Sequence, residues 1–514
     1  MNRRTLLLGG FAASLARSSS FIKQDLFQQH VSRFNQRDSE DDSHFIRNGD
    51  CAEWMRANVP AFECPDQTVE EIYYFRWWTY RKHIRKTPRG FVVTEFLPDV
   101  PWAGKYNTFS CAAGHHFYEG RWIRNREYLD DYGRFWFSPD GEPRRYSFWV
   151  ADAIHARYLV HGDQQPAVEL LPTLTANYRE WEKDHRDPNR LFWQIDDRDG
   201  MEYSLGGSGY RPTINSYLYG DAKAIASLAS LANNDDTRRA FEKESGLLRQ
   251  LCEQELWDND AQFYKTKPRG GGALPVSVRE EIGYVPWYFL LPRPGREMAW
   301  GQLFDSQGFY GRFGPTSAER RSRGYFVAHN HECLWNGPSW PFATTQTLVA
   351  LANLLNHYEQ QFVSKTNYFD LLRTYVRSQH KRQPDGSVVP WIDENLHPDT
   401  GEWIARDILH RLKRPDQSRG KDYNHSAFGD LVITGLAGLR PRPDSTLEVN
   451  PLIPNGRWPY FCLENVHYHG RTLAVIWDAD GSRYGRGAGL QLFADGRRLA
   501  QSVRLDRIEA DLNL

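Results

Sequence analysis

Hydrophobic residues recur every three or four positions over several long stretches of the chain, which is the spacing of one face of an α-helix. The apolar positions of these faces are Val168, Leu171, Leu174, Tyr178 and Trp181, then Ile214, Leu218, Ile225, Leu228 and Leu231, then Leu348, Leu351, Leu355 and Tyr358. Further helices are predicted over Ser147–Val160, Thr237–Leu256, Phe369–Ser378 and Phe428–Leu439. Ser147 and the run Asp235–Thr237 are predicted N-caps, since their side chains can accept from free backbone amides.

The loops between these helices are far longer than a simple helical bundle requires, and several combine aromatic residues with carboxylates. These loops are Trp102–Trp122, Val278–Phe289, His331–Phe342 and Trp391–Trp403. Many helices with such loops at one end favour a barrel of paired helices with a cleft at its mouth. The region is therefore predicted to be mainly α.

After about residue 440 the pattern changes to short alternating or β-branched runs, separated by Asp-Gly and Asn-Gly. The runs are Leu447–Leu452, His467–His469, Leu473–Trp477, Gly489–Phe493 and Val503–Ile508. They predict a small antiparallel β domain packed on the helical one. The predicted organisation is an N-terminal arm over residues 19–69, a helical domain over 70–440 and a β domain over 441–514.

The first residues of the chain have the pattern of an export signal. Paired Arg3 and Arg4 precede an apolar run, Leu6–Phe11, which is followed by small residues placed as at a cleavage site. This arrangement is typical of a twin-arginine signal peptide, predicted here over residues 1–18. No stretch approaches the about twenty apolar residues that a membrane-spanning helix needs. The protein is expected to be periplasmic or secreted.

Composition limits the classes of molecule that the protein is expected to bind. Lys and Arg number 64 against 65 Asp and Glu, for a formal charge of -1, so no nucleic-acid or anionic-membrane surface is indicated. Aromatic residues make up 14% of the chain, with 18 Trp, which suits either a large core or a cleft that stacks on sugar rings. The expected partner is a carbohydrate, and the sequence does not indicate an oligomeric state.

The six cysteines show no zinc-ligand spacing, so neither a metal nor another cofactor is predicted. In an oxidising compartment Cys51 and Cys64 can form a disulfide, and isolated buried thiols are an equally good reading.

Candidate chemistry begins in the loop Asp197–Gly209, which packs acids and glycines together. Glycosidic bond cleavage needs a carboxylic acid that protonates the leaving oxygen and a second carboxylate that acts as base or nucleophile. Asp197 and Asp199 flank Arg198, so both are expected to be solvated or ion-paired. Glu202 precedes a glycine-rich stretch that lets the backbone approach a ligand, and it is a candidate proton donor. From this loop alone, a capping or exposed glutamate is the simpler interpretation of Glu202.

The partner carboxylate is sought in the loop Trp391–Trp403. Residues 398–401 form a predicted turn that holds Glu394 between two tryptophans. Asp393 and Glu402 in the same loop compete with Glu394 for this role, and so does Glu281.

Four strings, WNGPSWPF, GMEYS, ENLHPDTGEW and YNHSAFGDLVITGLAGL, resemble the six-hairpin (α/α)6-barrel glycosidases. That group includes glycoside hydrolase family 63, the trehalases and the bacterial mannosylglycerate hydrolases. The resemblance covers roughly residues 70–440. It implies an (α/α)6 barrel, to which the predicted C-terminal antiparallel β domain is added.

The resemblance also implies roles for individual residues. Glu202 takes the position of a general acid that is an aspartate in the group, and Glu394 takes the position of the general base. The implied reaction is hydrolysis of α-linked sugars with inversion, in which Glu394 activates water while Glu202 protonates the departing oxygen. The α-glucoside, α-mannoside and α-L-rhamnoside classes remain open. The candidate substrate contacts are Tyr106, Asn107, His116, Glu119, Tyr210, Glu281, Trp335, Asn336 and Trp340.

Two other functions remain open at this point. A polysaccharide lyase on a helical toroid would need a base beside a cationic uronate site, for which His115, His116 and Arg121 are the candidates. A non-catalytic carbohydrate-binding protein is the other alternative, because Glu202 stands where the group carries aspartate.

Overall fold

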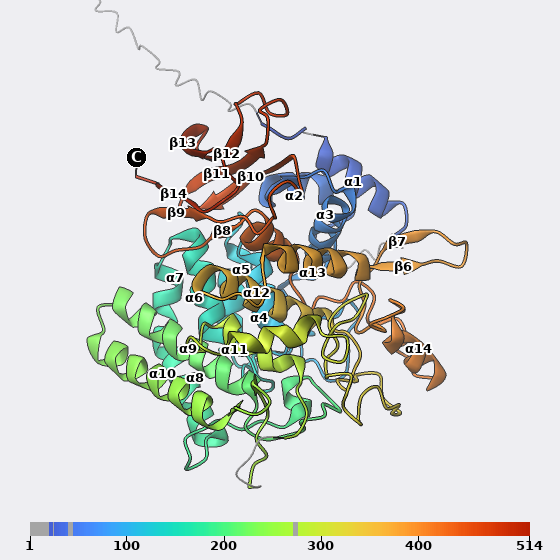
Figure 1. Ribbon diagram of the computed structural model, residues 1–514, viewed down its shortest axis with the longest axis vertical. Helices are drawn as coiled ribbons and strands as arrows, with labels where there is room; N and C mark the ends of the chain where they lie inside the picture. The colour runs from blue at the N-terminus through green and yellow to red at the C-terminus, as the bar shows by residue number, and fades with distance from the viewer. Residues whose placement is uncertain (1–19, 24, 40–44, 271–275, 514) are drawn as a thin grey trace, which may run out of the picture.

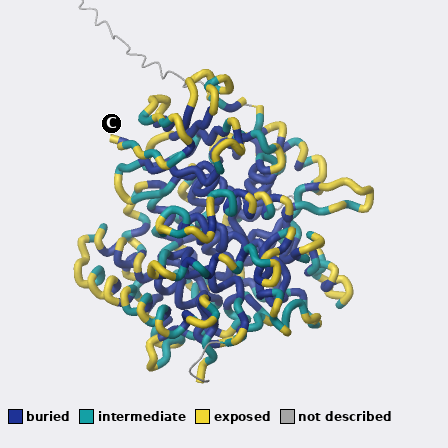
Figure 2. Tube along the Cα trace, viewed as in Figure 1, coloured by how far each residue is buried: buried dark blue, intermediate teal, exposed yellow. Residues whose placement is uncertain are grey.

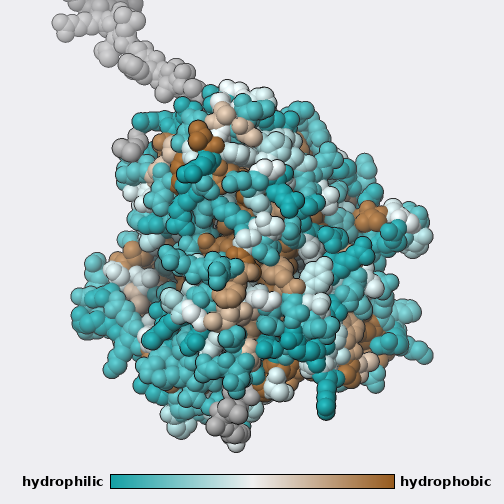
Figure 3. Space-filling view, in the orientation of Figure 1, coloured by the Kyte–Doolittle hydropathy of each residue, from teal (hydrophilic) through white to brown (hydrophobic). Residues whose placement is uncertain are grey.

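The computed structural model describes residues 20–23, 25–39, 45–270 and 276–513, and the predicted signal peptide lies outside these ranges. Helices form one large body, and the longer β-strands form a smaller part at one end of it (Figure 1). Buried residues run through both parts (Figure 2), and their contacts join into one hydrophobic core. Figure 3 shows a mostly hydrophilic face with hydrophobic side chains exposed near its centre.

The helical body is built from helices that follow one another along the chain, several of them separated by long loops. The α-helices are α3 (Gln67–Lys82), α4 (Ala113–Gly120), α5 (Glu127–Phe135), α6 (Val150–His161), α7 (Gln165–Glu169), α8 (Leu171–His185), α9 (Pro212–Leu231), α10 (Asp235–Glu255), α11 (Val285–Tyr288), α12 (Pro341–His357), α13 (Lys365–Ser378), α14 (Ile404–Arg411) and α15 (Gly429–Leu431). Short 3-10 helices span Asp196–Asp199, Glu281–Tyr284 and Glu297–Phe304, and a π-helix spans Val432–Leu436.

The helices predicted over residues 214–231 and 348–358 are confirmed as α9 and α12. Both helices begin at a proline, which suits a first turn because its missing N–H has no partner inside the helix. The predicted cap of α10 is displaced by one residue. The side chain of Asn234 accepts from the backbone amide of Thr237, and the helix begins at Asp235.

Three helix predictions need correction. The apolar face over 168–181 is divided between α7 and α8, because Pro172 in the first turn of α8 has no amide to continue α7. Ser147 does not cap α6, which begins at Val150, since its hydroxyl bonds the carboxyl of Asp199 instead. The helix predicted over 428–439 is one turn of α15 followed by the π-helix, so the hydrogen-bond pattern changes within the run.

The C-terminal part contains an antiparallel sheet of five strands in the order β1-β10-β11-β12-β13 and a three-stranded sheet in the order β14-β9-β8. The strands are β1 (Ala61–Glu63), β8 (Leu439–Arg440), β9 (Thr446–Val449), β10 (Tyr460–Tyr468), β11 (Arg471–Asp478), β12 (Gly489–Ala494), β13 (Arg497–Ser502) and β14 (Ile508–Asp511). The predicted strand Val503–Ile508 is wrong, since most of it connects β13 to β14 and Val503 is 83% exposed. Two-stranded hairpins in the body pair β2 (Ile84–Thr87) with β3 (Gly90–Val93), β4 (Trp257–Asp258) with β5 (Phe263–Tyr264), and β6 (His380–Arg382) with β7 (Val388–Pro390).

The predicted N-terminal arm is largely ordered structure. It contains α1 (Leu26–Asn35), α2 (Cys51–Asn58) and β1. Because β1 pairs with β10, this segment completes the C-terminal sheet from the far end of the chain. The expected boundary near residue 70 falls inside α3, and the one near 440 falls inside β8. Cys51 and Cys64 are separate buried thiols.

Candidate active site

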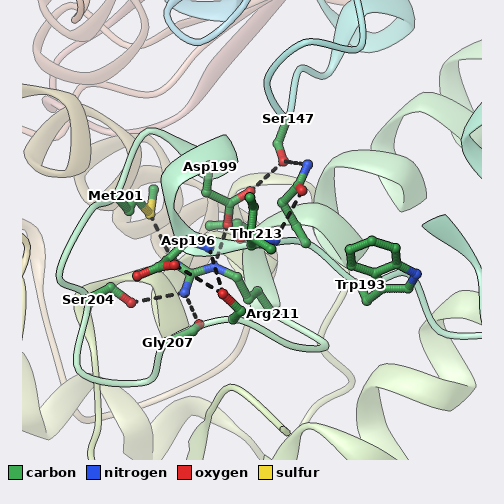
Figure 4. Close-up of polar contacts among 12 residues, drawn as sticks. Ser147, Trp193, Asp196, Asp199, Met201, Ser204, Gly207, Arg211 and Thr213 are labelled. Atoms are coloured by element: carbon green, nitrogen blue, oxygen red, sulfur yellow. Dashed lines mark hydrogen bonds and ion pairs between the residues drawn. The ribbon is translucent and has the colours of Figure 1, made fainter. Parts of the chain in front are cut away.

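The loop that carries Glu202 is anchored through Asp199. The Asp199 carboxylate, fully buried, forms an ion pair of 2.5 Å with the equally buried Arg211 guanidinium. It also accepts hydrogen bonds from the hydroxyls of Ser147 and Thr213 (Figure 4). Arg211 donates further to Ser204, so the two ends of the loop are tied together. Asp199 is thus a structural, ion-paired carboxylate, which is one of the two environments predicted for it from the sequence. Unlike an ordinary loop residue, it is buried.

Backbone geometry then turns the chain between Asp199 and Glu202. Gly200 has φ +71°, and a Cβ there would lie 2.4 Å from the Cys111 sulfur, so only glycine fits. Tyr203 also has a positive φ of 63°, which is unusual for a bulky side chain. Its ring is 42% exposed and lies against the ring of His329. The turn therefore presents Tyr203 outward and leaves Glu202 partly buried.

Glu202 is held by the loop His331–Phe342. The backbone amide of Trp335 donates to the Glu202 carbonyl at 3.0 Å, and the Cys333 sulfur lies 2.7 Å from its Oε2. Burial raises the pKa of Glu202 to about 7, and the negative charges of Asp197 and Glu394 add to this, whereas the Cys333 contact opposes it. No cation among the described residues forms an ion pair with this carboxyl, which favours its protonated form.

Glu394 is more deeply buried than Glu202, at 3% exposed, and has a cationic partner. Its Oε1 is 2.9 Å from Nε of Arg419, and burial raises its pKa to about 7 against the opposing effect of that guanidinium. Arg419 is shared, because it also lies 2.6 Å from carboxylates of Glu332 and Asp416. One positive charge is thus shared among three carboxylates, so Arg419 only partly offsets the effect of burial on the pKa of Glu394.

The loop His331–Phe342 connects the two carboxyls. Cys333 contacts Glu202, and its neighbour Glu332 contacts Arg419, which in turn contacts Glu394. The carbonyl of Glu332 also accepts from the Asn395 side chain at 2.9 Å. Since Glu394 is one of the charges that raise the pKa of Glu202, the two groups interact electrostatically. The structure brings together Glu202 and Glu394, which are far apart in the sequence.

The three competitors for the base have other partners. Asp393 pairs with Arg406 at 2.8 Å. Glu402 accepts from the Thr400 hydroxyl at 3.1 Å on the exposed side of the turn. Glu281 accepts from Thr347 of α12 at 2.9 Å, and burial raises its pKa to about 8, so it is a protonated group inside the barrel.

The substrate contacts predicted in the loop His331–Phe342 are buried in the structure. Trp335 and Trp340 stack on each other with ring centroids 4.6 Å apart, and each is 3% exposed. Asn336 is fully buried and donates to the carbonyl of Val327 at 2.8 Å. The exposed area of the two tryptophans is too small for a sugar ring to stack on them. These contacts support a role in packing the loop.

The remaining predicted contacts also interact within the protein. Asn107 holds the carbonyls of Phe96 and Pro98, His116 lies 2.6 Å from the Asn424 carbonyl, and Glu119 accepts from the backbone amides of residues 428–430. Tyr210 donates to Asp187 at 2.8 Å. Tyr106 packs edge-on against Phe135. The polar contacts of these side chains within the protein are those of structural residues.

Four residues near the two carboxyls are not identifiable as site candidates from the sequence: Glu95, Glu332, Cys333 and Arg419. Glu95 is 3% exposed, its Oε1 accepts from the Tyr423 hydroxyl, and burial raises its pKa with contributions from the charges of Glu394 and Glu202. Arg419 lies in a polar run of no periodic pattern, so only its contacts identify it. Glu332 and Cys333 lie in the predicted loop His331–Phe342, but their sequence context does not distinguish them from its other polar residues.

A groove of about 1140 Å³ lies on the outer side of the turn that follows Glu394. Glu402 and Trp403 line it together with residues of α13 and of the β6–β7 hairpin. Glu394 itself does not line this groove, so it is separate from the carboxyl pair. Within the described ranges, no cluster of three or more His, Cys, Asp or Glu residues could hold a metal. None of the helices described has the length and apolar character that crossing a bilayer requires.

Comparison with known proteins places the chain in a family. Residues 105–426, more than half of the chain, match the model of the mannosylglycerate hydrolase MGH1-like glycoside hydrolase domain. The chain belongs to this glycoside hydrolase family. Residues 439–500 match the C-terminal domain of glycosyl hydrolase family 65.

Solved structures agree with this family assignment. A protein named sialidase is 41% identical with a TM-score of 0.91 over 98% of this chain, and the chain spans 46% of that protein's length. A GH63 mannosylglycerate hydrolase from Thermus thermophilus, in complex with Tris and D-glycerate, is 15% identical with a TM-score of 0.53, over 71% of this chain and 100% of its own. An alpha-L-rhamnosidase from Dictyoglumus thermophilum is 10% identical with a TM-score of 0.53, over 87% of this chain and 45% of its own. At such low identity the last two show the fold, and the predicted mainly α (α/α)6 barrel with a small C-terminal antiparallel β domain is confirmed.

Proposed function

We propose that the protein hydrolyses an α-linked sugar with inversion, with Glu202 as general acid and Glu394 as general base. The observation that carries the proposal is the unequal charge environment of two carboxyls, the partly buried Glu202 and the buried Glu394. Arg419 stabilises the charged form of Glu394, whereas Glu202 has a thiol partner and, within the part of the chain that the structure describes, no cationic one. Once Glu394 is ionised, its negative charge favours retention of the proton on Glu202.

The proposed reaction follows from these two states. The ionised Glu394 removes a proton from a water molecule, which attacks the anomeric carbon, and Glu202 gives its proton to the oxygen that departs. Water and leaving group then lie on opposite faces of the sugar ring, so the configuration inverts. Each carboxyl ends in the protonation state of the other, and exchange with solvent resets the pair.

The charges around the carboxyl pair favour a neutral sugar. Glu332 and Asp416 share Arg419 with Glu394, so the one guanidinium is already bonded to three carboxylates. A sugar that carries its own carboxylate would be repelled by these negative charges. Among the described residues of this cluster, no guanidinium is left to pair with it. We therefore rank neutral α-mannosides, α-glucosides and α-L-rhamnosides above sialic acid glycosides as substrates.

The lyase alternative lacks its chemistry in this structure. Arg121 pairs with Asp430 at 2.7 Å, His115 lies between the apolar rings of Trp149 and Phe342, and burial lowers the pKa of His115. A uronate-binding cation and an accessible base are therefore not assembled there. Export through the twin-arginine route, to the periplasm or the medium, remains our proposal from the sequence of residues 1–18.

A panel of aryl glycosides tests the function. We expect release of the aryl alcohol from one neutral α-glycoside, and loss of that release in Glu394→Gln. The matched control is Glu402→Gln, an exposed carboxylate in the same turn, which should keep the wild-type rate. A Glu394→Gln variant with wild-type turnover would refute the assignment. Hydrolysis confined to sialic acid glycosides would overturn the preference for neutral sugars.

A further inference from the structure

The Cys333 thiol lies against one of the two proposed catalytic carboxyls. Its sulfur is 2.7 Å from Oε2 of Glu202, and Cys333 is partly buried. Burial, followed by the nearby charge of Glu202, raises the pKa of this thiol well above its usual value. Near neutral pH the protonated thiol is therefore favoured, and it can donate a hydrogen bond to the carboxyl.

The backbone around Cys333 fixes the thiol relative to Glu202. The Cys333 amide donates to Nδ1 of His331 at 3.1 Å, and the Trp335 amide donates to the Glu202 carbonyl at 3.0 Å. The thiol and the backbone of Glu202 are thus held by the same short segment. A glutamate side chain has three rotatable bonds, so without a partner it would occupy several rotamers. Its carboxyl would then spend less time within hydrogen-bond distance of a fixed leaving oxygen.

We propose that Cys333 is a positioning residue for the general acid: its thiol donates to Glu202 and holds the carboxyl toward the leaving group. This inference rests on the proposed function for its catalytic meaning, whereas the contact itself can be tested without a substrate. The thiol also acts on the ionisation of Glu202, because a donor stabilises the charged carboxylate more than the neutral acid.

Other groups near Glu202 affect the same ionisation and must be held constant in a test. The titratable groups that interact with it electrostatically are Asp197, Glu394, Glu95, Cys111, Tyr146 and Cys333. Cys111 has no contact with the Glu202 carboxyl and lies 3.9 Å from the Asp199 carbonyl. Only the Cys333 side chain among them is bonded to the carboxyl, so substitution at 333 isolates that hydrogen bond.

The first test measures alkylation of Cys333 by iodoacetamide between pH 7 and 10, followed by peptide mass spectrometry. We expect Glu202→Gln to raise the Cys333 rate at pH 8–9 by roughly three- to tenfold, because loss of the negative charge lowers the pKa of the thiol. Cys252, buried in α10, is the internal control and should not change. An unchanged Cys333 rate would overturn the contact, whatever the protein hydrolyses.

The second test measures the pH dependence of kcat/KM on the aryl glycoside found in the panel. In Cys333→Ala the alkaline limb should move to higher pH by about 0.5–1 unit, since the charged form of Glu202 loses a donor. Its plateau should fall roughly tenfold for a poor leaving group and less for an activated one. Cys333→Ser, which keeps a donor, should restore both, and Cys252→Ala should match wild type.

The outcomes separate this inference from the proposed function. If Glu202→Gln hydrolyses poor leaving groups at the wild-type rate, the acid assignment fails and Cys333 has no acid to position. If Glu202→Gln is inactive on them while Cys333→Ala keeps the wild-type alkaline limb and leaving-group dependence, only the inference on Cys333 fails. A uniform fall in rate for every leaving group in Cys333→Ala, without a shift of the limb, would show a structural role and also overturn it.

Discussion

The loop around Glu202 and the turn around Glu394 each present a glutamate, partly buried in the loop and buried in the turn, and the partners of the two carboxyls differ. The turn supplies a guanidinium, Arg419, to its carboxyl, and the loop supplies a thiol from Cys333. Within the loop itself the difference is as large, because Asp199 has its own buried arginine and none of the described arginines pairs with Glu202. Charge partners together with burial thus distinguish the structural carboxylate, the proposed base and the proposed acid.

The largest expected effect is a difference in leaving-group dependence between variants of the proposed acid and the proposed base. Glu202→Gln should lower kcat by about 10³-fold for an alkyl or sugar leaving group and by far less for a dinitrophenyl group, which needs little protonation. Glu394→Gln should lower both by similar factors, because water activation is needed in each. Steady-state rates on matched substrates measure this. Equal leaving-group dependence in the two variants would contradict the difference in roles.

Stability should separate Asp199 from its neighbour Asp197. Asp199→Ala leaves Arg211 buried without its ion pair, which should cost about 3–5 kcal/mol of unfolding free energy. Asp197 is half exposed and lies 3.5 Å from Arg198, so Asp197→Ala should change stability by about 0.5 kcal/mol or less. Denaturant unfolding with both variants measures the contrast. A change of similar size in both would show that Asp199 does not anchor the loop.

A smaller effect is expected on the pH dependence. The folded-state pKa of Glu394 is about 7 with Arg419 present, and Glu394 acts in its ionised form. Arg419→Met removes a stabilising charge, so that pKa rises and the acidic limb of kcat/KM should move up by about 1 pH unit. Arg406→Met, which removes the partner of Asp393, is the control and should leave the limb in place. A downward shift in Arg419→Met would contradict the charge argument.

The fold was largely predictable because periodicity reports burial directly. The apolar faces over residues 214–231 and 348–358 became α9 and α12, and most of the expected C-terminal strands were found. The errors arose where a local interaction changes the backbone, as at Pro172, or where a distant residue takes the capping side chain, as Asp199 takes Ser147. Pairing of β1 with β10 could not be foreseen, because it depends on contacts between opposite ends of the chain.

The site was predictable only in part. Resemblance of short strings selected Glu202 and Glu394, and the structure brings them into one electrostatic cluster. The aromatic residues of the same loops were expected to bind sugar, but Trp335 and Trp340 stack on each other inside the protein. Arg419 and Cys333 have no recognisable local pattern, since their importance comes from tertiary contacts alone.

The anomeric configuration of the first product tests the central claim most directly. Time-resolved proton NMR during the first turnovers of the hydrolysed α-glycoside distinguishes the two anomers before mutarotation mixes them. The account predicts that the β anomer appears first and the α anomer follows as mutarotation proceeds, because water attacks the face opposite to the leaving group. Initial release of the α anomer would mean retention, and would contradict the roles assigned to Glu202 and Glu394.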